Sequence, residues 1–100
     1  MRVVSLQTLK VFGVLYPDAL QPLLAWYDEV TSANWTQPAD IKARYASASI
    51  LKNRRVVFNI RGNRYRLIVA VAYQLGVVYI KFVGTHEQYD LVDAETIEMN

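Results

Sequence analysis

The chain has 100 residues, of which 53% are hydrophobic and 20% are charged, with one histidine and no cysteine. This length and composition suit one folded domain over residues 1–100 and exclude a disordered tail. The lack of cysteine excludes disulfides and cysteine-ligated metals, and the single histidine excludes paired-histidine metal motifs. The longest apolar run, residues 67–73, is too short to span a membrane, and no secretory signal is evident, so we expect a cytoplasmic domain.

Charged residues are distributed unevenly along the chain. Residues 1–40 carry two basic and four acidic side chains, residues 41–84 carry nine basic and no acidic ones, and residues 85–100 carry five acidic ones. Six of the nine cations in the middle segment are arginines, whose planar guanidinium groups can bind two phosphate oxygens at once. The pattern favours a polyanion-binding surface over an ordinary solvated sheet face.

The first part of the chain predicts a short strand followed by helices. Residues 1–4 suit a strand, and apolar residues at helical spacing predict a helix over residues 5–16, with its first residue, a serine, as the cap. A second helix is expected over residues 18–33, where Pro22 is tolerable only in the first turn. A proline opens a third helix over residues 38–45. We expect these helices to form core and scaffold.

In the second half of the chain, apolar residues recur at every second position. This pattern predicts antiparallel strands over residues 55–60, 64–73 and 77–83, the second of them apolar on both faces and therefore central. Thr85 and Gln88 have the spacing of a capping box, which predicts a short helix. The expected fold is α+β, with N-terminal helices packed on a small antiparallel β-meander and a short C-terminal helix.

Three groups of polar residues interrupt the strand pattern. They are Lys52, Asn53, Arg54 and Arg55; then Arg61, Asn63, Arg64 and Arg66; then Lys81, His86, Tyr89 and Asp90. Arg64 and Arg66 lie two apart on a strand, so we expect both to project from one face about 7 Å apart, close to the spacing of successive phosphates. Arg66 lies deeper toward the apolar half and needs a partner, either a ligand or a salt bridge to Asp90 or Glu87.

The single histidine is the candidate proton carrier. His86 is expected at the first position of the short helix, where the helix dipole favours a neutral ring that can accept a proton. A lone histidine is often structural, but Tyr89 follows one turn later and Lys81 interrupts the neighbouring strand. Cleavage of RNA by its own 2′-hydroxyl needs a base, cations and an acid, and no metal. These residues fit such a nuclease, and they also fit a non-catalytic RNA-binding sheet.

Two motifs carry a family resemblance. Residues 58–68 read F-N-I-x-G-N-x-Y-R-L-I, and residues 85–90 read T-H-x-x-Y-D. Together with residues 35–42, these motifs closely resemble the HigB toxins of bacterial type II toxin–antitoxin modules, which belong to the RelE/ParE toxin superfamily. The resemblance covers nearly the whole chain.

The resemblance implies a RelE-like toxin fold and an mRNA interferase, an endoribonuclease that cuts mRNA on translating ribosomes without a metal or other cofactor. It implies a HigA-type antitoxin with a helix-turn-helix domain, and contact with operator DNA only through the toxin–antitoxin complex. The proposed catalytic residues are Arg66 and Lys81 for phosphate charge, His86 for proton transfer, and Tyr89 as acid or base-stacking group. The RNA-binding residues are expected to be Lys52, Arg54, Arg55, Asn59, Arg61, Asn63, Arg64 and Asp90.

Two other functions stay open on the sequence. A protein-targeting toxin could use the same scaffold, as the ParE branch does when it poisons DNA gyrase. An RNA-binding module without turnover is the other alternative. The assignment of general acid and general base also stays open.

Overall fold

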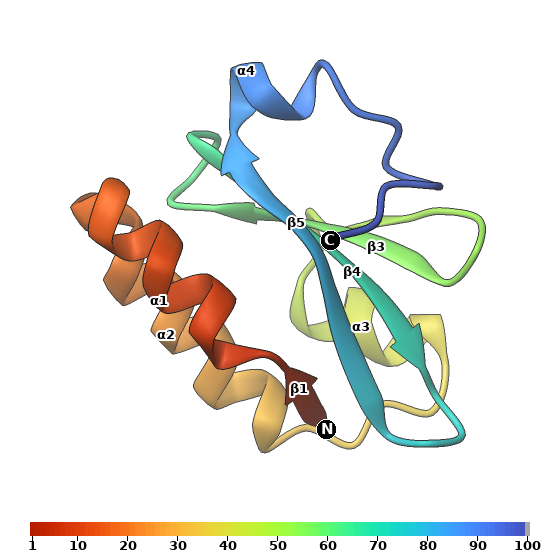
Figure 1. Cartoon of the computed structure of the whole chain (residues 1–100). Helices are drawn as coiled ribbons and strands as arrows, with labels where there is room; N and C mark the ends of the chain where they lie inside the picture. The colour runs from red at the N-terminus through yellow and green to blue at the C-terminus, as the bar shows by residue number, and fades with distance from the viewer. Residues whose placement is uncertain (100) are drawn as a thin grey trace.

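One short strand and three helices form the first half of the chain, and four successive strands and a short helix follow. The computed structural model describes residues 1–99. Its elements are β1 (Arg2–Val4), α1 (Leu6–Leu15), α2 (Pro17–Thr31), α3 (Pro38–Arg44), β2 (Ser49–Ile50), β3 (Arg55–Ile60), β4 (Tyr65–Ala72), β5 (Val77–Thr85) and α4 (His86–Tyr89). Figure 1 shows α1 and α2 side by side along the sheet, and α4 at the far end of β5. The predicted α+β class is confirmed.

The sheet has five strands in the order β1-β5-β4-β3-β2. The predicted antiparallel meander of β3, β4 and β5 forms its centre, and two short strands extend it at the edges. β1 pairs in parallel with β5, and the two-residue β2 pairs with the outer edge of β3. The sequence did not indicate β2, because a strand of two residues is too short to show an alternating pattern. It did not indicate the pairing of β1, because the partner strand lies more than seventy residues away along the chain.

A β-bulge interrupts the pairing of β4 with β5. Val69 pairs with Ile80 and the preceding Ile68 pairs with Phe82, so Lys81 is the extra residue of β5. The bulge lies in the middle of the sheet, and its extra residue is one that the sequence assigned to chemistry.

The hydrophobic core lies between the sheet and the helices. Phe58 of β3 packs against Trp26 of α2 and against Trp35, with ring centroids 5.4 and 6.2 Å apart. All eight residues of β4 are buried, as predicted for the central strand. The helices cover one face of the sheet, and residues 91–99 cross part of the other face (Figure 1). Within residues 1–99, no helix is both long enough and apolar enough to cross a membrane.

The helix starts differ from expectation in two places. Ser5 occupies the cap position of α1, but its side chain makes no capping hydrogen bond, and its hydroxyl lies 3.4 Å from that of Thr8. Helix α2 begins at Pro17, so Pro22 lies in the second turn, not in the first. The helix continues through Pro22, which sacrifices one backbone hydrogen bond, because Leu23 and Trp26 directly after it are anchored in the core.

The capping box at the start of α4 is confirmed. The backbone N–H of Gln88 donates to Thr85 Oγ1 at 3.1 Å, and the backbone N–H of Thr85 donates to Gln88 Oε1 at 2.9 Å. These two bonds fix α4 at the end of β5 and therefore fix where the side chain of His86 begins.

Gly13 of α1 lies against Leu20 of α2 and generates a stability prediction. A methyl group at this position would lie 2.6 Å from Leu20 Cδ1. We expect Gly13→Ala to lower the free energy of unfolding by about 1–2 kcal/mol, because the overpacking strain exceeds the gain in helix propensity. Urea unfolding measures the change. The control is Val14→Ala at a side chain that is 79% exposed, and we expect a change within about 0.5 kcal/mol. Equal stability of Gly13→Ala and the parent chain would contradict the prediction.

Candidate nucleic-acid interface

Several of the polar residues that interrupt the strands lie on the sheet face opposite the helices. Alternate residues of β3, Phe58 among them, belong to the helix-side core, so Arg55 and Asn59 project from the opposite face. Arg66 pairs directly with Asn59 and shares that face. Lys81 reaches it from β5, where it contacts the same carboxylate as Arg55. We call this surface, which carries these four residues, the open sheet face.

Arg66 is buried, with 9% of its surface exposed, and the β3–β4 turn holds it. Its guanidinium donates to the Asn63 backbone carbonyl at 3.1 Å and to Asn63 Oδ1 at 2.6 Å. Its Cζ lies 5.6 Å from the centroid of the Tyr89 ring. Within residues 1–99 it forms no salt bridge, so the alternative of a structural ion pair with Asp90 or Glu87 is not realised. Because its hydrogen-bond acceptors are neutral oxygens, no carboxylate neutralises the guanidinium, and it can pair with an anionic ligand.

The short helix α4 places His86 against the β3–β4 turn and Tyr89 over Arg66. The backbone N–H of His86 donates to the Arg64 carbonyl at 3.0 Å, which fixes α4 against the β3–β4 turn. The imidazole Nδ1 lies 3.3 Å from Asp90 Oδ2, and 43% of the side chain is exposed. This contact orients the ring and leaves Nε2 free to exchange a proton. We define the Arg66 cluster as Asn63, Arg66, His86, Tyr89 and Asp90.

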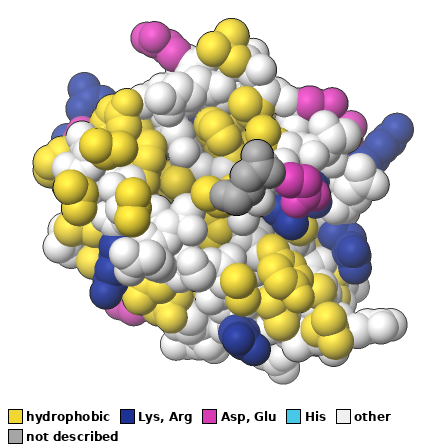
Figure 2. Space-filling model, viewed as in Figure 1, with side chains coloured by type: hydrophobic (Ala, Val, Ile, Leu, Met, Phe, Trp, Pro, Cys, Tyr) yellow, Lys and Arg dark blue, Asp and Glu magenta, His cyan; other side chains and the backbone are white. Residues whose placement is uncertain are grey.

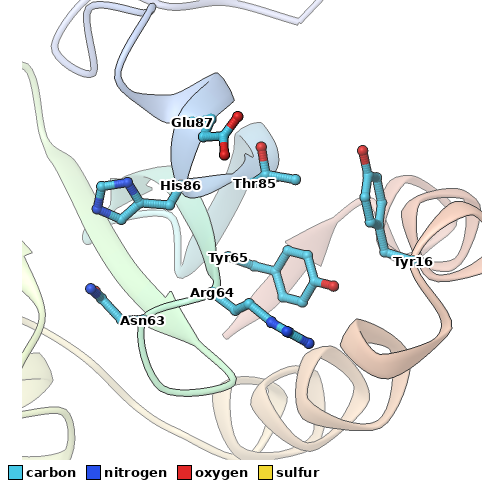
Figure 3. A pocket seen from close by; sticks show the side chains of 7 residues that line it. All are labelled: Tyr16, Asn63, Arg64, Tyr65, Thr85, His86 and Glu87. Atoms are coloured by element: carbon cyan, nitrogen blue, oxygen red, sulfur yellow. The ribbon is translucent and has the colours of Figure 1, made fainter.

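A cavity of about 370 Å³ opens beside the cluster, where α4, the β3–β4 turn and the end of α1 meet. It is lined by Tyr16, Asn63, Arg64, Tyr65, Thr85, His86 and Glu87 (Figure 3). Figure 3 shows His86 and Asn63 on one side of the strand, and Arg64 and Tyr65 on the other side toward the helices. The sequence did not point to Tyr16, because its spacing fits an ordinary core position.

Arg61 and Arg64 turn away from Arg66 and share one carboxylate. Arg64 Nη1 lies 2.7 Å and Arg61 Nη1 lies 3.6 Å from Asp18 Oδ2, and the Tyr65 hydroxyl donates to the same carboxylate. The expectation that Arg64 and Arg66 project from one face is therefore wrong. β4 begins at Tyr65, so Arg64 belongs to the turn, where the alternation of a strand does not hold.

Arg55 and Lys81 form a second basic group, and Glu98 joins them. Arg55 Nη2 donates to Glu98 Oε2 at 2.8 Å, and Lys81 Nζ donates to Glu98 Oε1 at 2.5 Å. Hydrogen bonds from Lys81 and then from Arg55 hold the pKa of Glu98 below its usual value. Glu98 is not among the predicted site residues, although its place in an acidic segment after a long basic one could have indicated it.

The remaining predicted RNA-binding residues lie in the loop before β3. Lys52 and Arg54 are exposed there, and Asn53 and Arg54 adopt positive φ angles of 57° and 58°. The Lys52 backbone N–H donates to Glu95 Oε2 at 3.0 Å, and the Asn53 side chain donates to the Glu95 carbonyl at 2.9 Å. The structure thus brings the residues of the Arg66 cluster together and places Asn59 opposite Arg66. It places Lys81 with Arg55, where both contact Glu98.

Within residues 1–99, no group of three or more histidine, aspartate and glutamate side chains is arranged to hold a metal ion.

Comparison with known proteins identifies the class to which this fold and face belong. Residues 19–92 match a family described as the RelE-like toxic component of a toxin–antitoxin system. The chain belongs to this family, the HigB toxins, and its partner is therefore an antitoxin. The predicted resemblance is confirmed.

Curated relatives agree with this family. The mRNA interferase toxin HigB of Escherichia coli strain K12 is 28% identical over 96 residues, which cover 94% of this chain and 92% of the relative. The proteins named mRNA interferase HigB from Escherichia coli O157:H7 and Shigella flexneri match to the same extent.

The Asp18 carboxylate generates a prediction on acid stability. The hydrogen bond from Tyr65, and then the bond from Arg64, lower the pKa of Asp18. A lowered folded-state pKa stabilises the fold above the unfolded-state pKa of about 3.9, and this contribution is lost as the pH falls through the folded-state pKa. We expect Asp18→Asn to be less stable than the parent at pH 6 and to lose less stability between pH 6 and pH 3. Urea unfolding at both pH values measures this.

The matched control is Asp28→Asn on α2, since the Asp28 side chain is exposed and makes no hydrogen bond or ion pair with another residue in the range 1–99. It should lose stability with falling pH in parallel with the parent chain. Parallel loss by Asp18→Asn as well would contradict the role of this carboxylate.

Proposed function

We propose that residues 1–100 form one toxin domain that acts as an mRNA interferase and cuts mRNA on translating ribosomes without a metal. The observation that carries the proposal is the Arg66 cluster, in which a buried guanidinium without a carboxylate partner lies over the ring of Tyr89 on α4, the short helix that begins with His86. The names of the curated relatives support the same activity. The cluster bears on the reaction class because RNA cleavage needs a cation that stabilises charge on the phosphate and a group that transfers protons.

The proposed reaction uses the RNA as its own nucleophile. The 2′-hydroxyl oxygen attacks the adjacent phosphorus, the bond to the 5′ oxygen breaks, and the products are a 2′,3′-cyclic phosphate and a 5′-hydroxyl. Arg66 stabilises the negative charge that builds up on the phosphate oxygens. His86 Nε2 exchanges the proton with the reacting oxygens, and Asp90 holds the ring through Nδ1.

Other residues guide the RNA in this proposal. Tyr89 lies over Arg66 and offers a ring face for a base or a phenol for the second proton transfer. Asn59 lies opposite Arg66 on the neighbouring strand and is exposed. Lys81 lies farther along the sheet from Arg66, so it binds the negatively charged phosphate backbone of the RNA. Four exposed cations contact the flanking phosphates of the RNA: Lys52, Arg54, Arg61 and Arg64.

The antitoxin in this proposal is of the HigA type, with a helix-turn-helix domain that contacts operator DNA for the complex. An acidic or helical segment of the antitoxin covers the basic face in the cytoplasm and blocks access of mRNA. The concentration of cations on the face opposite α1 and α2 supports this mode.

Arg66→Lys tests the need for a guanidinium. We expect mRNA cleavage to fall at least about 100-fold, because an ammonium cannot donate to Asn63 and to a phosphate in the planar arrangement of arginine. Mapping of mRNA 5′ ends after induction measures cleavage, and circular dichroism checks the fold. The matched control is Arg44→Lys on α3, an exposed arginine paired with Glu29, which should cleave as the parent does. Full cleavage by Arg66→Lys would count against the assignment.

His86→Ala separates the candidate functions. We expect a loss of cleavage of about 10²- to 10⁴-fold and relief of growth arrest with the fold intact, since a proton carrier is removed. Growth arrest of the parent with whole mRNA and broken DNA would favour a gyrase poison. Absence of both damage and toxicity would favour an RNA-binding module without turnover.

A further inference from the structure

The carboxylate of Glu98 lies between two cations of the open sheet face. Its two oxygens accept from Arg55 Nη2 at 2.8 Å and from Lys81 Nζ at 2.5 Å. Figure 2 shows acidic atoms against basic ones over the sheet on this face. Arg55 Nη2 also donates to the Ile97 carbonyl at 2.9 Å, so the C-terminal segment contacts the arginine through two successive residues.

The two cations have the properties of an anion site. Arg55 is 6% exposed, and its Nε is buried with no hydrogen-bond partner in the range 1–99. The Lys81 side chain is 22% exposed. A cavity of about 450 Å³ adjoins the pair and is lined by Asn53, Arg54, Arg55, Glu95, Thr96 and Glu98. A guanidinium and an ammonium that converge on two oxygens of one group bind a phosphate as readily as a carboxylate.

The C-terminal segment is held in a way that allows replacement. Residues 91–99 form no helix and no strand, and they reach the sheet side chains through Ile97 and Glu98. The Glu98 side chain is 58% exposed, so water screens the carboxylate from one side and weakens its hold on the two cations. An RNA strand that contacts several cations at once can therefore displace one carboxylate.

We propose that Arg55 and Lys81 form a phosphate subsite for the RNA backbone, and that Glu98 occupies this subsite in the free protein. The C-terminal segment then competes with RNA for the open sheet face. Arg55 pairs with Ala70, four residues along β4 from Arg66, which corresponds to about 13 Å. The subsite therefore holds a different phosphate of the same strand from the one at Arg66. This inference rests on the proposed function, because it takes RNA as the substrate.

Glu98→Gln tests the proposal, since glutamine keeps the shape and removes the charge. The probe is a fluorescently labelled single-stranded RNA oligonucleotide, and fluorescence anisotropy measures its affinity for proteins that all carry His86→Ala to prevent cleavage. We expect Glu98→Gln to bind about three- to tenfold more tightly, with a steeper dependence on salt, because RNA then displaces counterions in place of a carboxylate.

The matched control is Asp28→Asn in the same background. It changes the net charge equally, but on a helix that covers the opposite face of the sheet. We expect its affinity to change less than about twofold, because the screened charge lies far from the subsite. Equal affinities of the two variants, or weaker binding by Glu98→Gln, would overturn the proposal.

A measurement with Glu98 in place decides the question even if Glu98→Gln fails to fold. During a nuclear magnetic resonance titration with the oligonucleotide, the Glu98 carboxylate and Arg55 Nε signals should shift together with those of Arg66. Shifts at Arg66 without shifts at Glu98 would overturn the proposal. Mapping of mRNA ends tests the nuclease function separately, so a parent chain that cleaves mRNA together with an unresponsive Glu98 refutes only the competition.

Discussion

The site depends on a buried positive charge that neutral oxygens hold in place. Arg66 lies in the sheet with 9% of its surface exposed, and both oxygens of Asn63 accept from its guanidinium. A buried charge without an acidic partner is costly, so the turn must supply both hydrogen bonds to keep the arginine in place. The sharp β3–β4 turn, with positive φ at Arg61 and Gly62, is what brings Asn63 back over the strand. The cluster around Arg66 therefore inherits its geometry from the turn.

Local patterns in the sequence predicted the parts of this arrangement that depend on local chemistry. The capping box of Thr85 and Gln88 placed His86 at the start of α4, because both hydrogen bonds form within four residues. The apolar run of β4 indicated a central strand for a similar reason. The alternation of a strand failed at Arg64, where the chain is still turning and Asp18, from a distant helix, captures the guanidinium. Contacts between segments far apart in sequence carry no local signal.

Folding divides the basic stretch that the composition showed as one block. Arg61 and Arg64 pair with Asp18 on the helix side, Arg55 and Lys81 pair with Glu98 on the open face, and Arg66 forms no ion pair among the described residues. Net charge alone therefore misstates how much positive surface is free. Family membership follows from the sequence match, whereas the distribution of the charges follows only from the three-dimensional arrangement.

The bulge at Lys81 has a consequence for how such toxins can diverge. It gives β5 one residue more than β4 needs, so the alternation of inward and outward side chains reverses between Ile80 and Phe82. Loss of that single residue in a descendant would leave the pairs of Ile80 with Val69 and of Phe82 with Ile68 in place, so every later side chain of β5 would keep its face. An insertion or deletion elsewhere in β5 would instead turn the side chains beyond it to the opposite face, and α4 with its imidazole would start from the wrong side of the sheet. The bulge is thus the place where this strand can change its length without displacing α4.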